Sequence, residues 1–348
     1  MIAAWDPERP MASNRQLALH ATLPERYARF DLLASTIDHA GRLLVLLVDP
    51  AQEGSSGLPW RRQGPWSPPI PRFDAMAVIC DGDDVHEIPL HGLDQWFSEI
   101  DTLGEGVILG ASRIPVADYG RAERQSTLAT EVALIRNVQA FDGDGNPLVA
   151  FYAGDGIEQL LTDPSGRIWI SYFDEATYRF VNSDGTWSCS SGPGLARWDD
   201  PGSNPWFARN STGTAVSWVD CCALNVGRLL VHACPYTDFP MVEIDAYGVR
   251  SVTPNPVTGC HGLAVSGSTF AFLDHRRRGD AVVWQIRRAS RQGAEITETG
   301  RETLLLPGGR SPTRWARGRI GRDASLWIHE DGNPRRWYRY EIEDGDAH

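Results

Sequence analysis

The sequence contains no lysine, and all 33 of its basic residues are arginine. Schiff-base enzymes, P-loop nucleotide-binding proteins and protein kinases each depend on a lysine, so the sequence excludes these classes. It also lacks the HExxH, GxSxG and GxGxxG motifs, which disfavours zincins, α/β-hydrolases and Rossmann enzymes. Any chemistry must therefore come from other residue types.

Cysteines and long apolar segments are scarce as well. None of the six cysteines has CxxC spacing, and no apolar stretch approaches the roughly 18 residues of a membrane span. The first residues show no basic region followed by an apolar run, so we expect no signal peptide, reduced thiols and a cytoplasmic protein. The formal net charge of −12 argues against a nucleic acid or an anionic membrane as partner.

A two-strand pattern recurs along the chain. Each copy has a short strand, a tight polar or glycine turn, and an apolar strand that ends in an acidic or polar residue. A second hairpin follows most copies, as in AMAVICDGDDVHEIPL and NVQAFDGDGNPLVAFY. The copies of the first hairpin are residues 32–49, 97–113, 157–174, 219–235, 260–275 and 316–331.

Two hairpins per repeat make a four-stranded antiparallel unit, and almost no helical periodicity lies between the units, which favours a β-propeller over a sandwich. We predict one all-β domain over residues 1–348, a six-bladed β-propeller whose last blade is closed by an N-terminal strand at 15–23. Seven blades or a distorted ring are the alternatives. The predicted blades are residues 32–93, 94–154, 155–210, 211–258, 259–309, and 310–348 with 15–23.

The hairpin DPSGRIWISYFD (163–174) resembles the blades of the NHL, gluconolactonase and streptogramin-lyase propellers, in which a D-x-x-G-x-I/L-W hairpin joins the two inner strands. The resemblance covers most of the chain as a pattern and implies a propeller fold, but it is a blade signature rather than an enzyme signature. Gluconolactonase-like propellers use a glutamate with Asn and Asp in comparable places, and streptogramin-lyase-like ones use His and Glu near a metal. Only Glu158 resembles the first pattern and only His261 the second.

Propeller ligands usually meet the face at which the innermost strands begin. We align the copies on the turn after the first strand and count back five positions to find the residue at this channel mouth in each blade. Three neighbouring copies supply a glutamate, an aspartate and a histidine, and the next copy supplies an arginine. The predicted set is Leu33, Trp96 or Phe97, Glu158, Asp220, His261 and Arg317.

This set allows three interpretations, which the sequence leaves open. In the first, Glu158, Asp220 and His261 bind a divalent metal such as Ca²⁺, Mn²⁺ or Zn²⁺. Such a metal is the one cofactor that the sequence suggests. Without a metal, His261 and either carboxylate would form a general acid–base pair, and Arg317 would hold an anion or a developing negative charge. In the third interpretation these polar side chains satisfy one another and water in the channel.

Long insertions between the second and third strands mark the first three blades, at residues 50–73, 114–136 and 175–193. Long loops in a compact repeat fold are often lids or binding surfaces, and these loops carry several aromatic residues. We therefore predict a small organic or peptide-like ligand rather than a flat protein partner. The predicted ligand-binding residues are Trp60, Trp66, Trp96, Tyr178, His275 and Arg276.

Two functions follow from these features. The favoured one is a propeller enzyme of the lyase, isomerase (or cyclase) or hydrolase type, whose catalytic residues are Glu158, Asp220, His261 and Arg317. The alternative is a non-catalytic propeller that binds a ligand or a partner protein through its long loops. The two are discriminated by whether the carboxylates and the imidazole converge on an open cavity.

Overall fold

The computed structural model describes residues 13–52, 72–113, 136–174, 180–181, 187–188, 194–279 and 281–343. Nearly all of its regular structure is strand, so the all-β prediction is confirmed. None of the helices in this part of the chain combines the length and the apolar character that a membrane crossing needs. The cytoplasmic location stays a prediction. The described helical segments are η1 (Glu25–Tyr27), α2 (Ala208–Thr212) and η5 (Gly213–Ala215).

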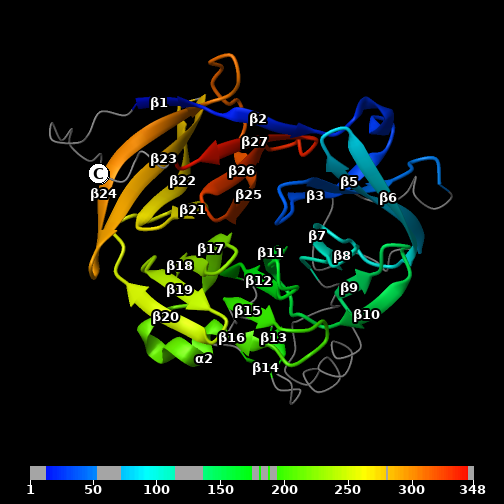
Figure 1. Cartoon of the computed structure of the whole chain (residues 1–348), viewed down its shortest axis with the longest axis horizontal. Helices are drawn as coiled ribbons and strands as arrows, with labels where there is room; N and C mark the ends of the chain where they lie inside the picture. The colour runs from blue at the N-terminus through cyan, green and yellow to red at the C-terminus, as the bar shows by residue number, and fades with distance from the viewer. Residues whose placement is uncertain are drawn as a thin grey trace.

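Consecutive strands pair antiparallel in sheets of four around a common centre, so the protein is a β-propeller (Figure 1). The innermost strands are β3 (Asp31–Ile37), β7 (Glu99–Leu103), β11 (Ile157–Thr162), β17 (Asp220–Val226), β21 (Gly262–Ser266) and β25 (Ala316–Arg322). The second strands are β4 (Leu43–Val48), β8 (Gly106–Gly110), β12 (Ile168–Tyr172), β18 (Val231–Tyr236), β22 (Thr269–Arg278) and β26 (Ser325–Glu330).

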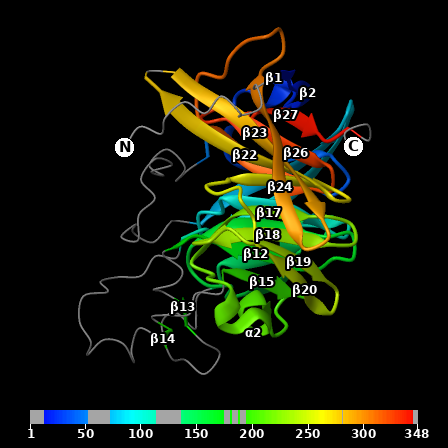
Figure 2. The same ribbon diagram turned by 90° about the vertical axis from the view of Figure 1, so that its left-hand side faces the viewer.

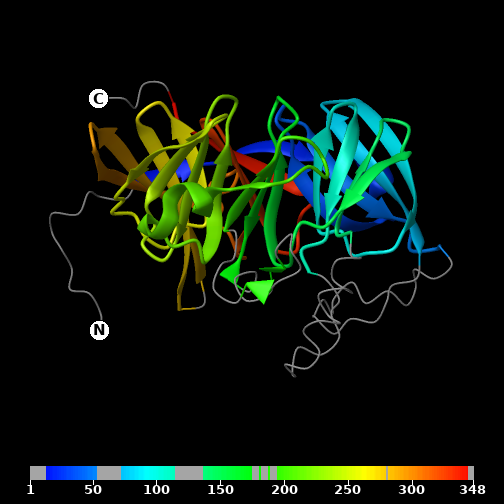
Figure 3. The same ribbon diagram turned by 90° about the horizontal axis from the view of Figure 1, so that it is seen from below.

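The outer half of every sheet except the last is built from the second hairpin of the repeat, and the strands run across the thin dimension of the molecule (Figure 3). The third strands are β5 (Phe73–Asp81), β9 (Val138–Phe141), β15 (Leu195–Trp198), β19 (Met241–Asp245), β23 (Ala281–Gln292) and β27 (Arg336–Glu341). The outermost strands are β6 (Asp84–Leu93), β10 (Pro147–Phe151), β16 (Trp206–Phe207), β20 (Gly248–Thr253), β24 (Glu295–Leu305) and, beside β27, β2 (Ala18–Thr22). A separate short hairpin pairs β13 (Phe180–Val181) with β14 (Trp187–Ser188).

The N-terminal segment closes the last sheet, as predicted. β2 pairs antiparallel with β27, while β1 (Ser13–Gln16) pairs parallel with β24 of the neighbouring sheet. Between them, Leu17 is only 2% exposed and its backbone N–H donates to the Leu305 carbonyl at 2.8 Å. One short segment therefore holds two sheets together, whereas the prediction assigned all of 15–23 to the last blade alone.

Two of the sheets merge at the centre. A parallel bridge between Asn225 and Gly321 joins the β17 and β25 sheets into one eight-stranded sheet. This close approach needs glycine at 321, because a Cβ there would lie 2.1 Å from the carbonyl oxygen of Leu263. Because this bridge joins two of the four-stranded units into one sheet, strand pairing alone does not give a blade count, and six blades stays a prediction.

The hydrophobic core lies between neighbouring sheets rather than in one central mass. Ile108 of the β7 sheet, for example, shares a buried cluster with Ile170 and Trp198 of the β11 sheet. The Phe151 and Trp198 rings, which lie on the two facing sheets, have centroids 5.6 Å apart. Each sheet therefore buries both of its faces, which explains the apolar second strand in every repeat.

A buried arginine links several sheets at the end of the innermost strands opposite the predicted mouth. The Arg322 guanidinium donates to Asp101 Oδ2 at 2.7 Å, to the Thr162 carbonyl at 2.7 Å and to the Ile37 carbonyl at 3.2 Å. The side chains of Arg322 and Asp101 are 4% and 0% exposed. The β25 strand is thereby connected to β3, β7 and β11 across the centre of the ring.

Candidate functional site

Bulges mark the innermost strands at the end where the mouth is predicted. In four inner hairpins the innermost strand has one residue more than its partner strand. These extra residues lie between Leu32 and Ala34, between Ile157 and Gln159, between Asp220 and Ala223, and between Arg317 and Ile320. A bulge leaves a residue outside the strand ladder and re-aims its side chain. The side chains that meet at the mouth are therefore set by these bulges as well as by strand alternation.

An ion pair between Glu158 and Arg319 lies at the centre of this cluster. The two residues come from β11 and β25, which face each other across the centre of the ring (Figure 1). Their side chains are 18% and 11% exposed. Gln159, next to Glu158, donates from Nε2 to the Arg319 carbonyl at 3.2 Å. The β11 bulge thus supplies both the partner of the guanidinium and a support for its backbone.

The backbone of Arg319 is held in the left-handed region, with φ 55°. This conformation costs a non-glycine residue on the order of 1 kcal/mol and is found mainly where function or packing requires it. The preceding Gly318 also has positive φ, and it packs against the rings of Trp337 and His329. Arg319 Nε has no hydrogen-bond partner among the described residues. The strained bulge therefore presents a guanidinium with an unused donor.

Glu99 is a member of the cluster that the sequence did not identify. It begins β7, whose pairing with β8 has no bulge, and its Oε1 lies 3.5 Å from the Ser112 hydroxyl. Burial, and then the Glu158 carboxylate, raise the pKa of Glu99 well above its ordinary 4.5, against the lowering effects of the Ser112 hydrogen bond and the Arg319 charge. Glu99 therefore keeps its proton at pH values where an ordinary glutamate has lost it.

We expect Glu99→Gln to change how stability depends on pH. Because the pKa of Glu99 is raised in the folded protein, its contribution to stability is complete below about pH 4.5 and is lost as the pH rises through the folded pKa. Across that interval the wild type should lose up to about 1.4 kcal/mol per pH unit relative to Glu99→Gln. Urea unfolding of both proteins from pH 4.5 to 8.5 measures this difference, and a constant difference would contradict the assignment.

Asp220 lines a cavity of about 150 Å³ beside the ion pair. Cys222 donates from Sγ to Asp220 Oδ1 at 2.8 Å, and His261 lines the same cavity. Burial raises the pKa of Asp220, and the Glu158 and Asp174 carboxylates raise it further. Burial and the Glu158 and Asp220 charges also raise the pKa of Cys222, so its thiol is neutral rather than a nucleophilic thiolate.

His261 and His275 lie together on the other side of the mouth. Their rings are stacked with centroids 4.4 Å apart, and Trp315 meets His275 edge-on at 4.8 Å. Burial first, and then the neighbouring His261, lower the pKa of His275 to about 3. Burial and the Arg319 charge also lower the pKa of His261. Both imidazoles are therefore neutral and suited to accept a hydrogen bond, and with a pKa of about 3 His275 is too weak a base to take up a proton near pH 7.

The remaining predicted residues that the structure describes have partners outside the ion pair. Arg317 pairs with Asp331 at 3.4 Å, with side chains 52% and 46% exposed. Arg276, near the end of the long β22–β23 ribbon seen in Figure 2, donates to Asp274 at 2.6 Å. Trp96 packs on the cluster between the β3 and β7 sheets, 6.3 Å from the Phe73 ring. Trp60, Trp66 and Tyr178 lie outside the described residues.

The predicted metal ligands do not form a ligand set as they lie. The Glu158 carboxylate is engaged by Arg319, the Asp220 carboxylate accepts from Cys222, and His261 stacks on His275. In the part of the chain that the structure describes, no group of three or more His, Cys, Asp and Glu side chains is arranged to hold a metal ion. We derive no step through a metal.

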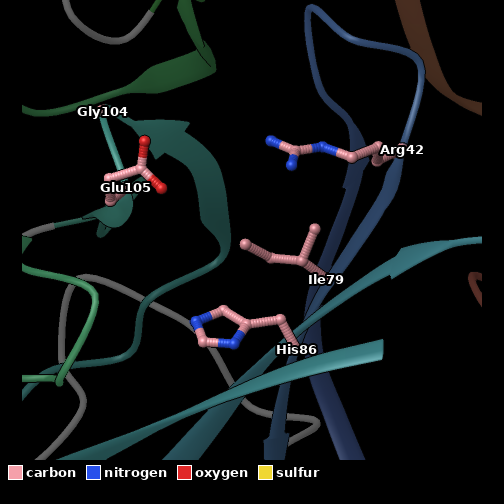
Figure 4. A pocket seen from close by; sticks show the side chains of 5 residues that line it. All are labelled: Arg42, Ile79, His86, Gly104 and Glu105. Carbon is pink, nitrogen blue, oxygen red and sulfur yellow. The ribbon is translucent and has the colours of Figure 1, made fainter. Parts of the chain in front are cut away.

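Two further cavities lie at the turn end of the innermost strands. One of about 220 Å³ opens between the β3 and β7 sheets, where Arg42 and Glu105 extend from opposite sides and Ile79 and His86 lie below them in the view (Figure 4). The Arg42 guanidinium is already paired with Asp38 at 2.8 Å. Another cavity of about 270 Å³ lies beside Arg322. Neither contains residues of the mouth cluster.

Comparison with known proteins adds little to this geometry. No protein family and no curated protein matches the sequence. Similar solved structures include a gluconolactonase from Xanthomonas campestris, at 11% identity and a TM-score of 0.35 over 98% of this chain and 99% of the other. A subtype N11 neuraminidase-like protein of A/flat-faced bat/Peru/033/2010 (H18N11) has 10% identity and a TM-score of 0.46 over 92% of this chain and 93% of the other.

A luciferin-regenerating enzyme is similar at the same level, with 9% identity and a TM-score of 0.36 over 94% of this chain and 93% of the other. Likenesses this weak carry no argument about activity. The fold rests on the strand pairing and the candidate site on its own residues.

Proposed function

We propose that the protein is an enzyme that catalyses proton transfer on a small organic or peptide-like molecule at the channel mouth. The observation that supports this most is the meeting of Glu99, Glu158 and Arg319 beside the cavity that Asp220 and His261 line. Titratable groups with displaced pKa values, grouped around a cavity, are the usual form of an acid–base site.

The side chains at the mouth can be assigned separate roles in proton transfer. Glu99, whose pKa is raised, is suited to be the general acid. Asp220 lies in the cavity wall and His261 is a neutral imidazole there, so either is suited to be the general base. Arg319 would stabilise a negative charge that develops on the substrate, which is the role predicted above for Arg317. Lyases, isomerases and hydrolases all use such a proton transfer.

A non-catalytic ligand-binding propeller is the second candidate. It is favoured by the Glu158–Arg319 contact, because two charges that neutralise each other need no substrate. It differs from the enzyme in one measurable respect, since a binding protein leaves its ligand chemically unchanged.

A turnover screen with matched variants separates the two candidates. The screen uses a panel of small carbonyl compounds, esters and cyclic peptides in deuterium oxide, followed by NMR. We expect the wild type to convert at least one of these compounds or to exchange one of its protons for deuterium. In Asp220→Asn the rate should fall about 100-fold or more, which is the usual contribution of a general acid or base. Glu295, exposed at the start of β24, provides the control Glu295→Gln, which should keep the wild-type rate.

Retained turnover in Asp220→Asn, Glu99→Gln and Glu158→Gln alike would place the reaction elsewhere and contradict the proposal. A ligand that binds the wild type but is neither converted nor exchanged would identify a binding protein instead.

A further inference from the structure

We propose that the cavity beside Asp220 binds an ammonium group, so that the substrates of the proposed enzyme are small amines. That the bound amine is a substrate rests on the proposed function. That the cavity binds a cation rests on the cavity alone. The cavity holds about 150 Å³, or roughly five water volumes. It therefore suits the charged end of a small molecule rather than a whole peptide.

The walls of the cavity combine one carboxylate with aromatic rings. Asp220 and Tyr236 are directly opposite each other in the β17–β18 ladder. Phe239 meets Tyr236 edge-on with ring centroids 5.7 Å apart, and both rings line the cavity. A carboxylate beside aromatic faces is the combination that attracts ammonium ions, through a charge-assisted hydrogen bond and cation–π contacts. The Tyr236 side is open to a ligand, since that residue is 48% exposed.

The charges around the cavity favour a cation over an anion. The Asp220, Glu158 and Asp174 carboxylates act together on this region. The opposing charges of Arg319, Arg317 and Arg287 are each already paired with a carboxylate, of Glu158, Asp331 and Glu298 respectively. The other polar groups in the wall are the thiols of Cys222, Cys234 and Cys260 and the imidazole of His261. Burial lowers the pKa of the imidazole and raises the pKa of the Cys222 thiol, and a hydrogen bond with Cys234, followed by burial, raises the pKa of the Cys260 thiol, so all three groups are neutral. No cationic side chain of the described residues lines this cavity.

A metal cation fits the same wall less well. Divalent ions need several oxygen, nitrogen or thiolate ligands, and the described residues contain no group of three such side chains arranged around one point. An ammonium ion needs only hydrogen-bond acceptors and polarizable contacts, and its three donors can use Asp220 together with backbone oxygens or water. The chemistry of the wall therefore selects an organic cation.

The test compares three probes of equal length, n-butylammonium, 1-butanol and butyrate, by ligand-observed NMR titration of the full-length protein. We expect n-butylammonium to bind at least about tenfold more tightly than 1-butanol, because a charge-assisted hydrogen bond contributes about that factor. Butyrate should not bind. Asp220→Asn should remove the preference, whereas Asp144→Asn, which deletes an equal charge in an exposed hairpin turn, should preserve it.

A second variant guards against misfolding of Asp220→Asn. Tyr236→Leu should weaken n-butylammonium by about two- to fivefold and leave 1-butanol unchanged, because it removes a cation–π contact and keeps the apolar wall. Equal binding of all three probes, stronger binding of butyrate, or an unchanged preference in both variants would overturn the inference.

The outcomes keep the two proposals apart. Turnover of uncharged compounds without any preference for n-butylammonium would overturn the ammonium site and leave the enzyme. A clear preference for n-butylammonium that both variants reduce, with neither an amine nor any compound of the turnover panel converted, would leave the ammonium site and overturn the enzyme.

Discussion

Replacing Arg322 with leucine is expected to lower the free energy of unfolding by about 3–5 kcal/mol, the usual cost of leaving a buried charge without its partner. The variant would leave the Asp101 carboxylate, whose side chain is 0% exposed, without its cationic partner. The carbonyls of Thr162 and Ile37 would lose a hydrogen-bond donor as well. Urea or guanidinium unfolding at pH 7 measures the loss.

The double variant Arg322→Leu/Asp101→Leu should recover part of this loss, since it removes the stranded charge as well. Arg317→Leu is the matched control on the same strand. Its ion pair with Asp331 is about half exposed, and breaking it should cost less than about 1 kcal/mol. Equal losses for Arg322→Leu and Arg317→Leu would show that the buried network does not hold the sheets together.

Gly318→Ala is expected to destabilise the fold by about 3 kcal/mol and to displace Arg319 from Glu158. A Cβ at Gly318 would lie 2.2 Å from Trp337 Cη2 and 2.9 Å from His329 Cδ2, and the residue has φ 76°. The cost combines overpacking against two rings with a left-handed backbone that alanine disfavours. Urea unfolding gives the first quantity, and the turnover or binding assay of the site gives the second.

Gly166→Ala separates the two causes. Gly166 has a similar φ of 82°, but nothing lies within 4 Å of a Cβ built there, so it should lose only about 1 kcal/mol. If Gly318→Ala loses no more than Gly166→Ala, the rings of Trp337 and His329 do not hold the bulge in place.

The fold could be predicted from the sequence to the extent that it depends on local signals. Alternating apolar residues around tight turns specify hairpins, and repeated hairpins specify sheets of four, as the pairing of β3 to β6 shows. The strand that closes the last sheet was predicted because an unpaired edge is unfavourable. The parallel pairing of β1 with β24 was not predicted, because four residues carry no signal of their partner.

The candidate site could be predicted only in part. Counting positions from the turns identified Glu158, which lies in the central ion pair, and Asp220 and His261, which share a cavity. The same count selected Arg317, whereas Arg319 is the arginine that contacts Glu158. Arg317 is the last residue paired before the bulge and Arg319 lies inside it, where the side chain is re-aimed, and a count along a single chain cannot detect this change of direction.

The sequence by itself determined the all-β class, the hairpin repeat and the exclusion of lysine chemistry, because composition and the two-residue period of strands are local properties. The tertiary structure decided which side chains meet. Glu99 and Glu158 interact although 59 positions separate their numbers, and it is their burial together that raises the pKa of Glu99. Such effects depend on which strands become neighbours and on how much water they exclude, and neither can be predicted from any one segment of the chain.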